Sequence, residues 1–241
     1  MTLFVKLCGI RTEADLDAAV EAGADAIGFV LTPSPRQIPL SVAARLNAKL
    51  PDSVLGVAVF YDPSPDLLLR AQDEVGPDLF QSEHSTLVGI SADRLLPVVV
   101  DGESLDRDFA NAVRSAGREM VVVDSAARGG TGVTPRWERL AELKGPGRLI
   151  LAGGLDPENV GDAVSLVRPF GVDVSSGIEK SQGEKDPKRM QAFVEAARSS
   201  STLSPPVGGS TAEGGEGGVL GHLPQRRFAP GGGNGGEGGI A

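Results

Sequence analysis

The chain has 241 residues, and 23 Lys and Arg against 32 Asp and Glu give it a formal net charge of −9, so it lacks the basic face that a nucleic-acid partner would require. One cysteine and two histidines exclude a disulfide framework and a cysteine-rich zinc site, so we expect no bound metal. No apolar run reaches the roughly 18 residues that span a bilayer and no signal peptide opens the chain, so we expect a cytoplasmic protein with no membrane partner.

Short apolar segments alternate with helical patterns along the first 198 residues. Most residues in these segments are apolar, without alternation of apolar and polar positions, which is typical of strands buried on both faces of a parallel sheet. The predicted strands are 4–7, 26–31, 55–60, 78–81, 95–100, 120–123, 149–151 and 172–174.

The segments between these strands predict helices. Thr12 and Asp15 form the pattern of a capping box at the start of the first helix, which Gly23 ends. Asp156 and Pro157 predict an N-cap and the first helical residue of a later helix. The other helices are expected over 40–50, 64–75, 103–116, 136–143 and 186–198, and the connection 83–93 has room for no more than two helical turns.

Eight strands that alternate with helices predict an α/β protein with a single (β/α)₈ barrel, the TIM-barrel fold. An open doubly wound sheet is the alternative. It usually has fewer strands, and the glycine fingerprint GxGxxG does not follow the first strand.

The composition changes after residue 198. Of the 43 residues from Ser199 to Ala241, 14 are glycine, and such a segment cannot bury enough apolar surface to offset the entropy of ordering. We therefore expect residues 1–198 to be the catalytic domain and 199–241 to be a disordered low-complexity tail. A partner-docking role for the short segment 220–228 is the alternative.

Candidate catalytic residues follow from the barrel, because active sites in this fold lie at the carboxyl ends of the strands. Cys8 follows the first strand and Asp124 the sixth, and together they suit one general base and one general acid. Lys6 would point the same way as Cys8, and its ammonium would lower the pKa of the thiol. A buried apolar cysteine and a turn-capping aspartate are the simpler interpretations.

Two kinds of anion site are expected at the same end. Glycine-rich turns after the last strands predict a backbone N–H cradle for a phosphate, although such glycines also simply make tight turns. Arg36 lies after the second strand in a loop stiffened by Pro33 and Pro35, and this position predicts a clamp for a carboxylate. The cradle residues are Gly130, Gly153, Gly154, Ser175, Ser176 and Gly177.

Several of these segments together resemble one enzyme family. The motifs are KLCGI at 6–10, GADAIGFV at 23–30, SPR at 34–36, DS at 124–125 with GGTG at 129–132, LAGGLDPENV at 151–160 and GVDVSSGIE at 171–179. They resemble the motifs of phosphoribosylanthranilate isomerases, in register from about residue 4 to 197.

The resemblance implies a (β/α)₈ barrel without a cofactor, a monomer or homodimer, that acts on a small phosphosugar. The implied reaction belongs to tryptophan biosynthesis. It is the Amadori rearrangement of N-(5′-phosphoribosyl)anthranilate to 1-(2-carboxyphenylamino)-1-deoxyribulose 5-phosphate. In the family pattern Cys8 corresponds to the general base, Asp124 to the general acid, and Arg36 to the residue that contacts the anthranilate carboxylate.

The sequence departs from the family after the fourth strand. Glu83 stands where the family often has the histidine of a QLHG motif, so no role passes to His84. Two other functions compete with the isomerase as interpretations of the sequence. A broad-specificity aminoaldose isomerase would use two aspartates, which Cys8 argues against, and a non-catalytic phosphate-binding scaffold would not need Cys8, Asp124 and Arg36 together.

Overall fold

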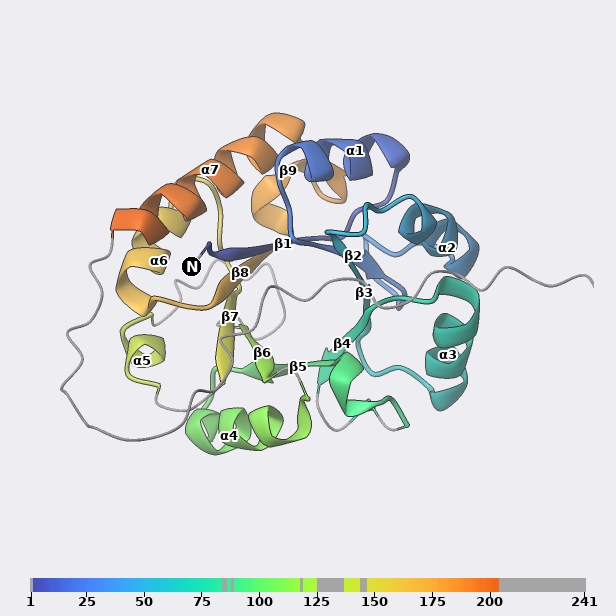
Figure 1. Cartoon of the computed structure of the whole chain (residues 1–241), viewed down its shortest axis with the longest axis horizontal. Helices are drawn as coiled ribbons and strands as arrows, with labels where there is room; N and C mark the ends of the chain where they lie inside the picture. Colours follow the sequence, from blue (N-terminus) through green and yellow to red (C-terminus); the bar gives the residue numbers. More distant parts are fainter. Residues whose placement is uncertain are drawn as a thin grey trace, which may run out of the picture.

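The fold is a closed barrel of eight parallel strands, seen end-on in the computed structural model (Figure 1). The structure describes residues 2–83, 86–87, 89–117, 119–124, 137–143 and 147–203. Each strand pairs with its chain neighbours, and β8 closes the ring on β1. The strands are β1 Phe4–Cys8, β2 Ala26–Val30, β3 Leu55–Val59, β4 Leu79–Glu83, β5 Leu95–Val100, β6 Met120–Asp124, β7 Arg148–Ala152 and β8 Gly171–Val174.

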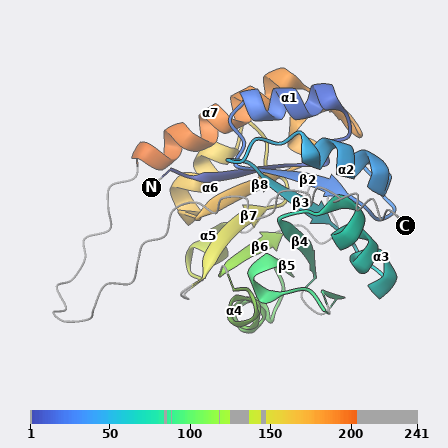
Figure 2. The ribbon, with the colours of Figure 1, turned by 45° about the vertical axis from the view of Figure 1, so that its right-hand side comes forward.

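Helices surround this barrel on its outer side, as the turned view makes clear (Figure 2). They are α1 Glu13–Glu21, α2 Leu40–Ala48, α3 Pro65–Arg70, α4 Leu105–Ser115, α5 Trp137–Ala141, α6 Val160–Val167 and α7 Pro187–Leu203. A π-helical turn, Ala71–Val75, continues α3, and a 3₁₀ turn, Ala92–Arg94, precedes β5. Alternation of strands and helices thus confirms the predicted (β/α)₈ barrel. None of the helices in the described ranges is long and apolar enough to cross a membrane.

The ends of two helices test the capping predictions. At α1 the backbone N–H of Asp15 donates to Thr12 Oγ1 at 3.1 Å, and that of Thr12 donates to Asp15 Oδ2 at 3.2 Å, so the capping box is confirmed. The predicted start of α6 is wrong. Asp156 Oδ1 accepts from the N–H groups of Glu158 and Asn159, which closes a separate turn, and the helix begins only at Val160.

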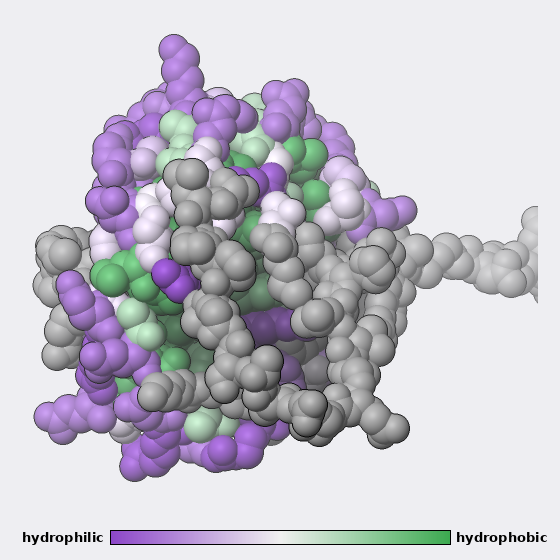
Figure 3. Space-filling view, turned by 60° about the vertical axis from the view of Figure 1, so that its left-hand side comes forward, coloured by the Kyte–Doolittle hydropathy of each residue, from purple (hydrophilic) through white to green (hydrophobic). Residues whose placement is uncertain are grey.

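Two hydrophobic layers hold the barrel together. The inner layer consists only of strand residues, among them Phe4, Leu55, Met120 and Ile150, while the outer layer joins the strands to the helices. On the face in Figure 3, hydrophilic residues gather around the rim and apolar residues lie further in. Since Phe4 faces inward, the alternation along β1 also directs Lys6 and Cys8 into the barrel.

One element was not predicted. After β8 the chain makes a 3₁₀ turn, Ser176–Ile178, and then a small antiparallel hairpin of β9 (Glu179–Ser181) and β10 (Glu184–Lys185) before α7. The last helix also runs to Leu203, five residues beyond the predicted end at 198.

Candidate active site

The predicted acid–base residues both end strands of the barrel. Cys8 is the last residue of β1 and Asp124 the last residue of β6. Because all eight strands are parallel in one closed barrel, both residues lie at the same end of it. Asp124 is half-buried, and its position is fixed by pairing with Val100 on β5 and Ala152 on β7.

Lys6 and Cys8 share the inner face of β1, as predicted. Gly28 on the neighbouring strand leaves the space that they fill, because a Cβ at that position would lie 2.7 Å from Cys8 Sγ and 3.1 Å from Lys6 Nζ. Lys6 is fully buried and donates to both carboxylate oxygens of Asp173 on β8, at 2.8 Å each. Burial disfavours the ammonium, but Asp173 and Cys8 outweigh it and raise the pKa of Lys6.

Lys6 lowers the pKa of the Cys8 thiol, as predicted, but the expectation that the pKa is lowered overall is wrong. Burial raises the pKa of Cys8 and is the largest influence on it. The ammoniums of Lys6 and Lys185 lower the pKa, whereas the charge of Asp173 raises it, and the balance lies above the ordinary value. The environment of the unliganded site therefore favours the neutral thiol of Cys8 over the thiolate.

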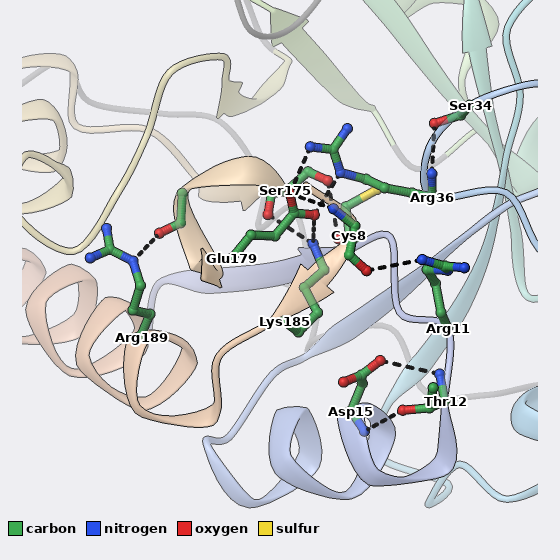
Figure 4. A network of polar contacts seen from close by, with 12 residues as sticks. Cys8, Arg11, Thr12, Asp15, Ser34, Arg36, Ser175, Glu179, Lys185 and Arg189 are labelled. Carbon is green, nitrogen blue, oxygen red and sulfur yellow. Dashed lines mark hydrogen bonds and ion pairs between the residues drawn. The ribbon is translucent and has the colours of Figure 1, made fainter. Parts of the chain in front are cut away.

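Arg36 lies in the loop between β2 and α2, and its guanidinium already holds a carboxylate. Its Nε and Nη2 donate to Glu179 Oε1 and Oε2 at 2.7 and 2.8 Å. The loop itself is fixed by a hydrogen bond from the Arg36 N–H to Ser34 Oγ at 3.1 Å. One edge of the Arg36 guanidinium is thus occupied by a carboxylate of the protein itself (Figure 4).

The predicted phosphate loops follow β7 and β8. Gly153 and Gly154 both have positive φ, +90° and +66°, where other residues are strained. A Cβ on Gly177 would lie 1.9 Å from the Leu155 carbonyl oxygen, so this glycine lets the two loops pack against each other. Ser175 Oγ donates to the Cys8 carbonyl at 3.2 Å, and Ser176 begins the 3₁₀ turn. Gly130 lies outside the described residues.

The structure adds residues that were not predicted. Glu179 and Lys185 come from the hairpin, and Lys185 Nζ donates to Glu179 Oε1 at 2.9 Å and to the Ser175 carbonyl at 2.8 Å. Asp173 was part of a recognised motif, but no role was assigned to it. At the end of β4, Glu83 is exposed, and His84 lies outside the described residues. Within the described ranges no three His, Cys, Asp or Glu side chains gather as metal ligands would.

Comparison with known proteins identifies close relatives of the whole barrel. The family model described as N-(5′-phosphoribosyl)anthranilate (PRA) isomerase matches residues 5–196. The N-(5′-phosphoribosyl)anthranilate isomerase of Geobacter sp. (strain M21) is 42% identical over 202 residues, which cover 80% of this chain and 97% of that protein. That of Natronomonas pharaonis is 38% identical over 203 residues, with 80% and 97% covered.

Solved structures agree with these relatives. TrpF from Jonesia denitrificans superposes with a TM-score of 0.70 at 31% identity, over 84% of this chain and all of the other. The phosphoribosylanthranilate isomerase of Thermotoga maritima gives 0.68 at 36% identity, over 82% and 99%. A further phosphoribosylanthranilate isomerase structure, in complex with reduced 1-(o-carboxyphenylamino)-1-deoxyribulose 5-phosphate, gives 0.66 at 35% identity, over 82% and 99%.

Proposed function

The chain belongs to the N-(5′-phosphoribosyl)anthranilate isomerase family, and on that basis we propose that Cys8 and Asp124 are the acid–base pair of its reaction. The enzyme acts in tryptophan biosynthesis and isomerises its phosphoribosyl substrate by an Amadori rearrangement. The observation that carries the residue assignment is the position of one thiol and one carboxyl group at the same end of the barrel, on β1 and β6.

Asp124 acts first in this proposal. Protonated Asp124 donates its proton to the furanose ring oxygen while the bond between that oxygen and C1 breaks. The lone pair of the anilino nitrogen forms the C1=N bond of a Schiff base. A carboxyl group can do this only if it is protonated when the substrate binds.

Cys8 acts second. Its thiolate takes the proton from C2, and the electrons of the C2–H bond form the C1=C2 bond of an enolamine as the C1=N electrons return to nitrogen. Loss of the C2 hydroxyl proton and protonation of C1 then give the ketone. The groups of the protein exchange only protons with the substrate, and no step transfers a hydride or an electron to an acceptor. The proposed reaction therefore requires no cofactor.

The raised pKa of Cys8 makes the surrounding charges part of the mechanism. The thiol must lose its proton before it can act as base, and Lys6 and Lys185 are the two ammoniums that favour this ionisation. Lys6 is held in place by Asp173 and Lys185 by Glu179. Each ion pair fixes the position of its ammonium group near the sulfur, where negative charge forms.

The two anionic ends of the substrate are assigned to separate groups. The turns with Gly153, Gly154, Ser175, Ser176 and Gly177 bind the phosphate, supported by their position after β7 and β8 and by the backbone conformations that their glycines permit. Arg36 binds the anthranilate carboxylate, supported by the bidentate geometry that its guanidinium already adopts.

The organisation of the chain belongs to the same proposal. The predicted boundary at residue 198 moves to 203, because α7 continues to Leu203. Residues 1–203 form the catalytic domain, and residues 204–241, which lie outside the described part of the chain, form a non-catalytic tail. The protein works in the cytoplasm as a monomer or homodimer on its small phosphosugar. Light scattering coupled to size exclusion would determine the oligomeric state. One related structure is described as mutually generated monomers of the dimeric Thermotoga maritima enzyme, so the description names that enzyme as a dimer from which monomers were generated.

The decisive experiment follows loss of phosphoribosylanthranilate fluorescence with purified protein. Wild type is compared with Cys8→Ala and Asp124→Asn at equal concentration, and with Glu184→Gln, which changes an exposed carboxylate on the hairpin, as a control. We expect turnover in the wild type and the control and a large loss of kcat in both test variants. Full activity in either test variant would remove that residue from the mechanism.

A further inference from the structure

The carboxylate of Glu179 is surrounded by donors from two parts of the chain. Its Oε1 accepts from Arg36 Nε at 2.7 Å and Lys185 Nζ at 2.9 Å. Its Oε2 accepts from Arg36 Nη2 at 2.8 Å and the Gly183 N–H at 3.1 Å. A carboxylate offers about four lone-pair positions, so these donors use all of them, and the Glu179 side chain is only 4% exposed.

Such a carboxylate is a permanent partner of Arg36 rather than an occupant that substrate displaces. Its release would leave the fully buried ammonium of Lys185 without its counter-charge, which is strongly unfavourable in a site closed to water. Burial disfavours the charged form of Glu179, but the bonds from Arg36 and Lys185 lower its pKa to about 2. The Glu179 carboxylate therefore stays ionised and bonded throughout the neutral range.

Arg36 is also fixed along its aliphatic stem. Gly9, with φ of +79°, lies directly beneath it, and a Cβ there would stand 2.8 Å from Arg36 Cδ. The tip of the hairpin meets the same loop, since a Cβ on Gly183, which also has φ of +79°, would lie 2.9 Å from the Pro35 carbonyl oxygen. The Arg36 side chain thus has Gly9 against its stem, and Figure 4 shows Glu179 at its guanidinium end.

This arrangement determines which part of the guanidinium can meet a substrate. The edge formed by Nε and one hydrogen of Nη2 belongs to Glu179, which leaves Nη1 and the second hydrogen of Nη2. A carboxylate approaching that remaining edge would again be bound by two parallel N–H donors. The Arg36 side chain retains 20% exposure, so a ligand can reach it.

We propose that Glu179 is a positioning residue that holds Arg36 with its Nη1 and Nη2 edge toward the aromatic carboxylate of the substrate. Glu179 thereby selects aniline rings that carry an ortho carboxylate over those without one. The inference rests on the proposed role of Arg36 as the carboxylate clamp. It adds that the selectivity depends on the hairpin of β9 and β10, which carries Glu179, as well as on Arg36 itself.

The test compares two ligands by titration calorimetry. One is reduced 1-(o-carboxyphenylamino)-1-deoxyribulose 5-phosphate, and the other is the same molecule without the carboxylate. The proteins are wild type, Glu179→Gln, Arg36→Met, the double variant and Glu184→Gln. Glu184→Gln serves as the matched control. It changes an exposed carboxylate on the same hairpin, and this carboxylate pairs with Lys180.

We expect Glu179→Gln to weaken binding of the carboxylated ligand by about tenfold or more, as loss of a charge-assisted hydrogen bond does, and to leave the other ligand within about twofold. The double variant should bind no worse than Arg36→Met, because Glu179 acts through Arg36. In kinetics, KM should rise more than kcat falls. Glu184→Gln should match wild type.

The possible failures are distinguishable. If Arg36→Met affects both ligands equally, the carboxylate clamp itself is wrong. If Arg36→Met discriminates between the ligands and Glu179→Gln does not, only the positioning role is overturned. Equal weakening of both ligands by Glu179→Gln would make Glu179 merely structural. Should that variant fail to fold, Glu179→Asp keeps the charge but shortens the reach, and the same loss of selectivity is expected of it.

Discussion

Lys6 on β1 and Asp173 on β8 form an ion pair inside the barrel, in which Lys6 Nζ lies 2.8 Å from both carboxylate oxygens of Asp173. The pair lies where the last and first strands close the ring, in register with each other. Lys6 is the next inward-facing residue of β1 after Phe4, which belongs to the inner apolar layer. The pair therefore marks the level at which the apolar interior gives way to the polar site, directly below Cys8.

Breaking this pair should destabilise the barrel strongly. Lys6→Met would leave the buried Asp173 carboxylate without its counter-charge, with only a long hydrogen bond from Gln81 Nε2 at 3.5 Å, and loss of one partner of a buried ion pair typically costs about 3–5 kcal/mol. Urea denaturation should show that loss in the free energy of unfolding. The double variant with Asp173→Leu removes both charges and should lose much less than the two single variants together. A loss below about 1 kcal/mol for Lys6→Met would mean that the pair adds little to stability.

Cys8→Ala should abolish most turnover while it leaves the fold intact. General acid–base groups contribute about 10²–10⁴-fold, so kcat should fall within that range. The side chain is small and lies at the end of a strand, so the thermal midpoint should change little. A Cys8→Ala variant that keeps near-normal kcat would show that another group removes the C2 proton.

The pKa of Cys8 predicts the pH dependence of the wild-type enzyme. Burial raises this pKa above its ordinary value, and the base is active only as thiolate. The rate at which iodoacetamide alkylates Cys8, the one cysteine of the chain, depends on the thiolate alone and should therefore still rise as pH increases above neutrality. An alkylation rate that has already levelled off at pH 6 would show that the lysines, not burial, dominate the ionisation of Cys8.

Much of the barrel, and the position of Cys8 and Asp124 at the ends of two of its strands, could be predicted from the sequence, because both depend on local patterns. Apolar runs predicted all eight strands, and Cys8 and Asp124 follow from the rule that polar residues at carboxyl ends face the site. The pair of Lys6 and Asp173 could not be predicted in this way, since its partners lie 167 residues apart and meet only through closure of the barrel.

The hairpin escaped prediction for a different reason. Its strands have only three and two residues and no apolar alternation, so no period distinguishes them from a loop. Lys185 and Glu179 are ordinary charged residues in the sequence, and the fold alone brings them together with each other and with their partners Arg36 and Ser175. The direction of the Cys8 pKa was wrong because burial, which no sequence pattern reports, exceeds the effect of the neighbouring ammonium.

Glu179 should make the protein sensitive to acid. Its pKa is lowered from 4.5 to about 2, so its ionised form stabilises the folded chain above about pH 4.5, and that contribution is lost as pH falls toward 2. At neutral pH this contribution of ionised Glu179 to the free energy of unfolding should be about 3 kcal/mol. The stability difference between wild type and Glu179→Gln should shrink steadily between pH 5 and 2. A difference that stays constant over this range would show that ionisation of Glu179 is not its source.

Asp124→Asn tests the step that opens the ring. The amide keeps the shape of the side chain but has no carboxylic proton to donate, so kcat should fall by about 10²-fold or more. Binding of the reduced product analogue should survive, because Arg36 and the turns after β7 and β8 are unchanged.

The pH profile separates this role from a structural one. In the wild type, kcat/KM should be bell-shaped, with the basic limb set by deprotonation of Asp124 and the acidic limb by protonation of Cys8. Both limbs belong to the coupled pair, so single residues are assigned only through the variants. In Asp124→Asn the basic limb should disappear from whatever activity remains, whereas the acidic limb should stay. If the variant keeps both limbs and most of its kcat, Asp124 only caps the end of β6, and the proton that opens the ring comes from another group.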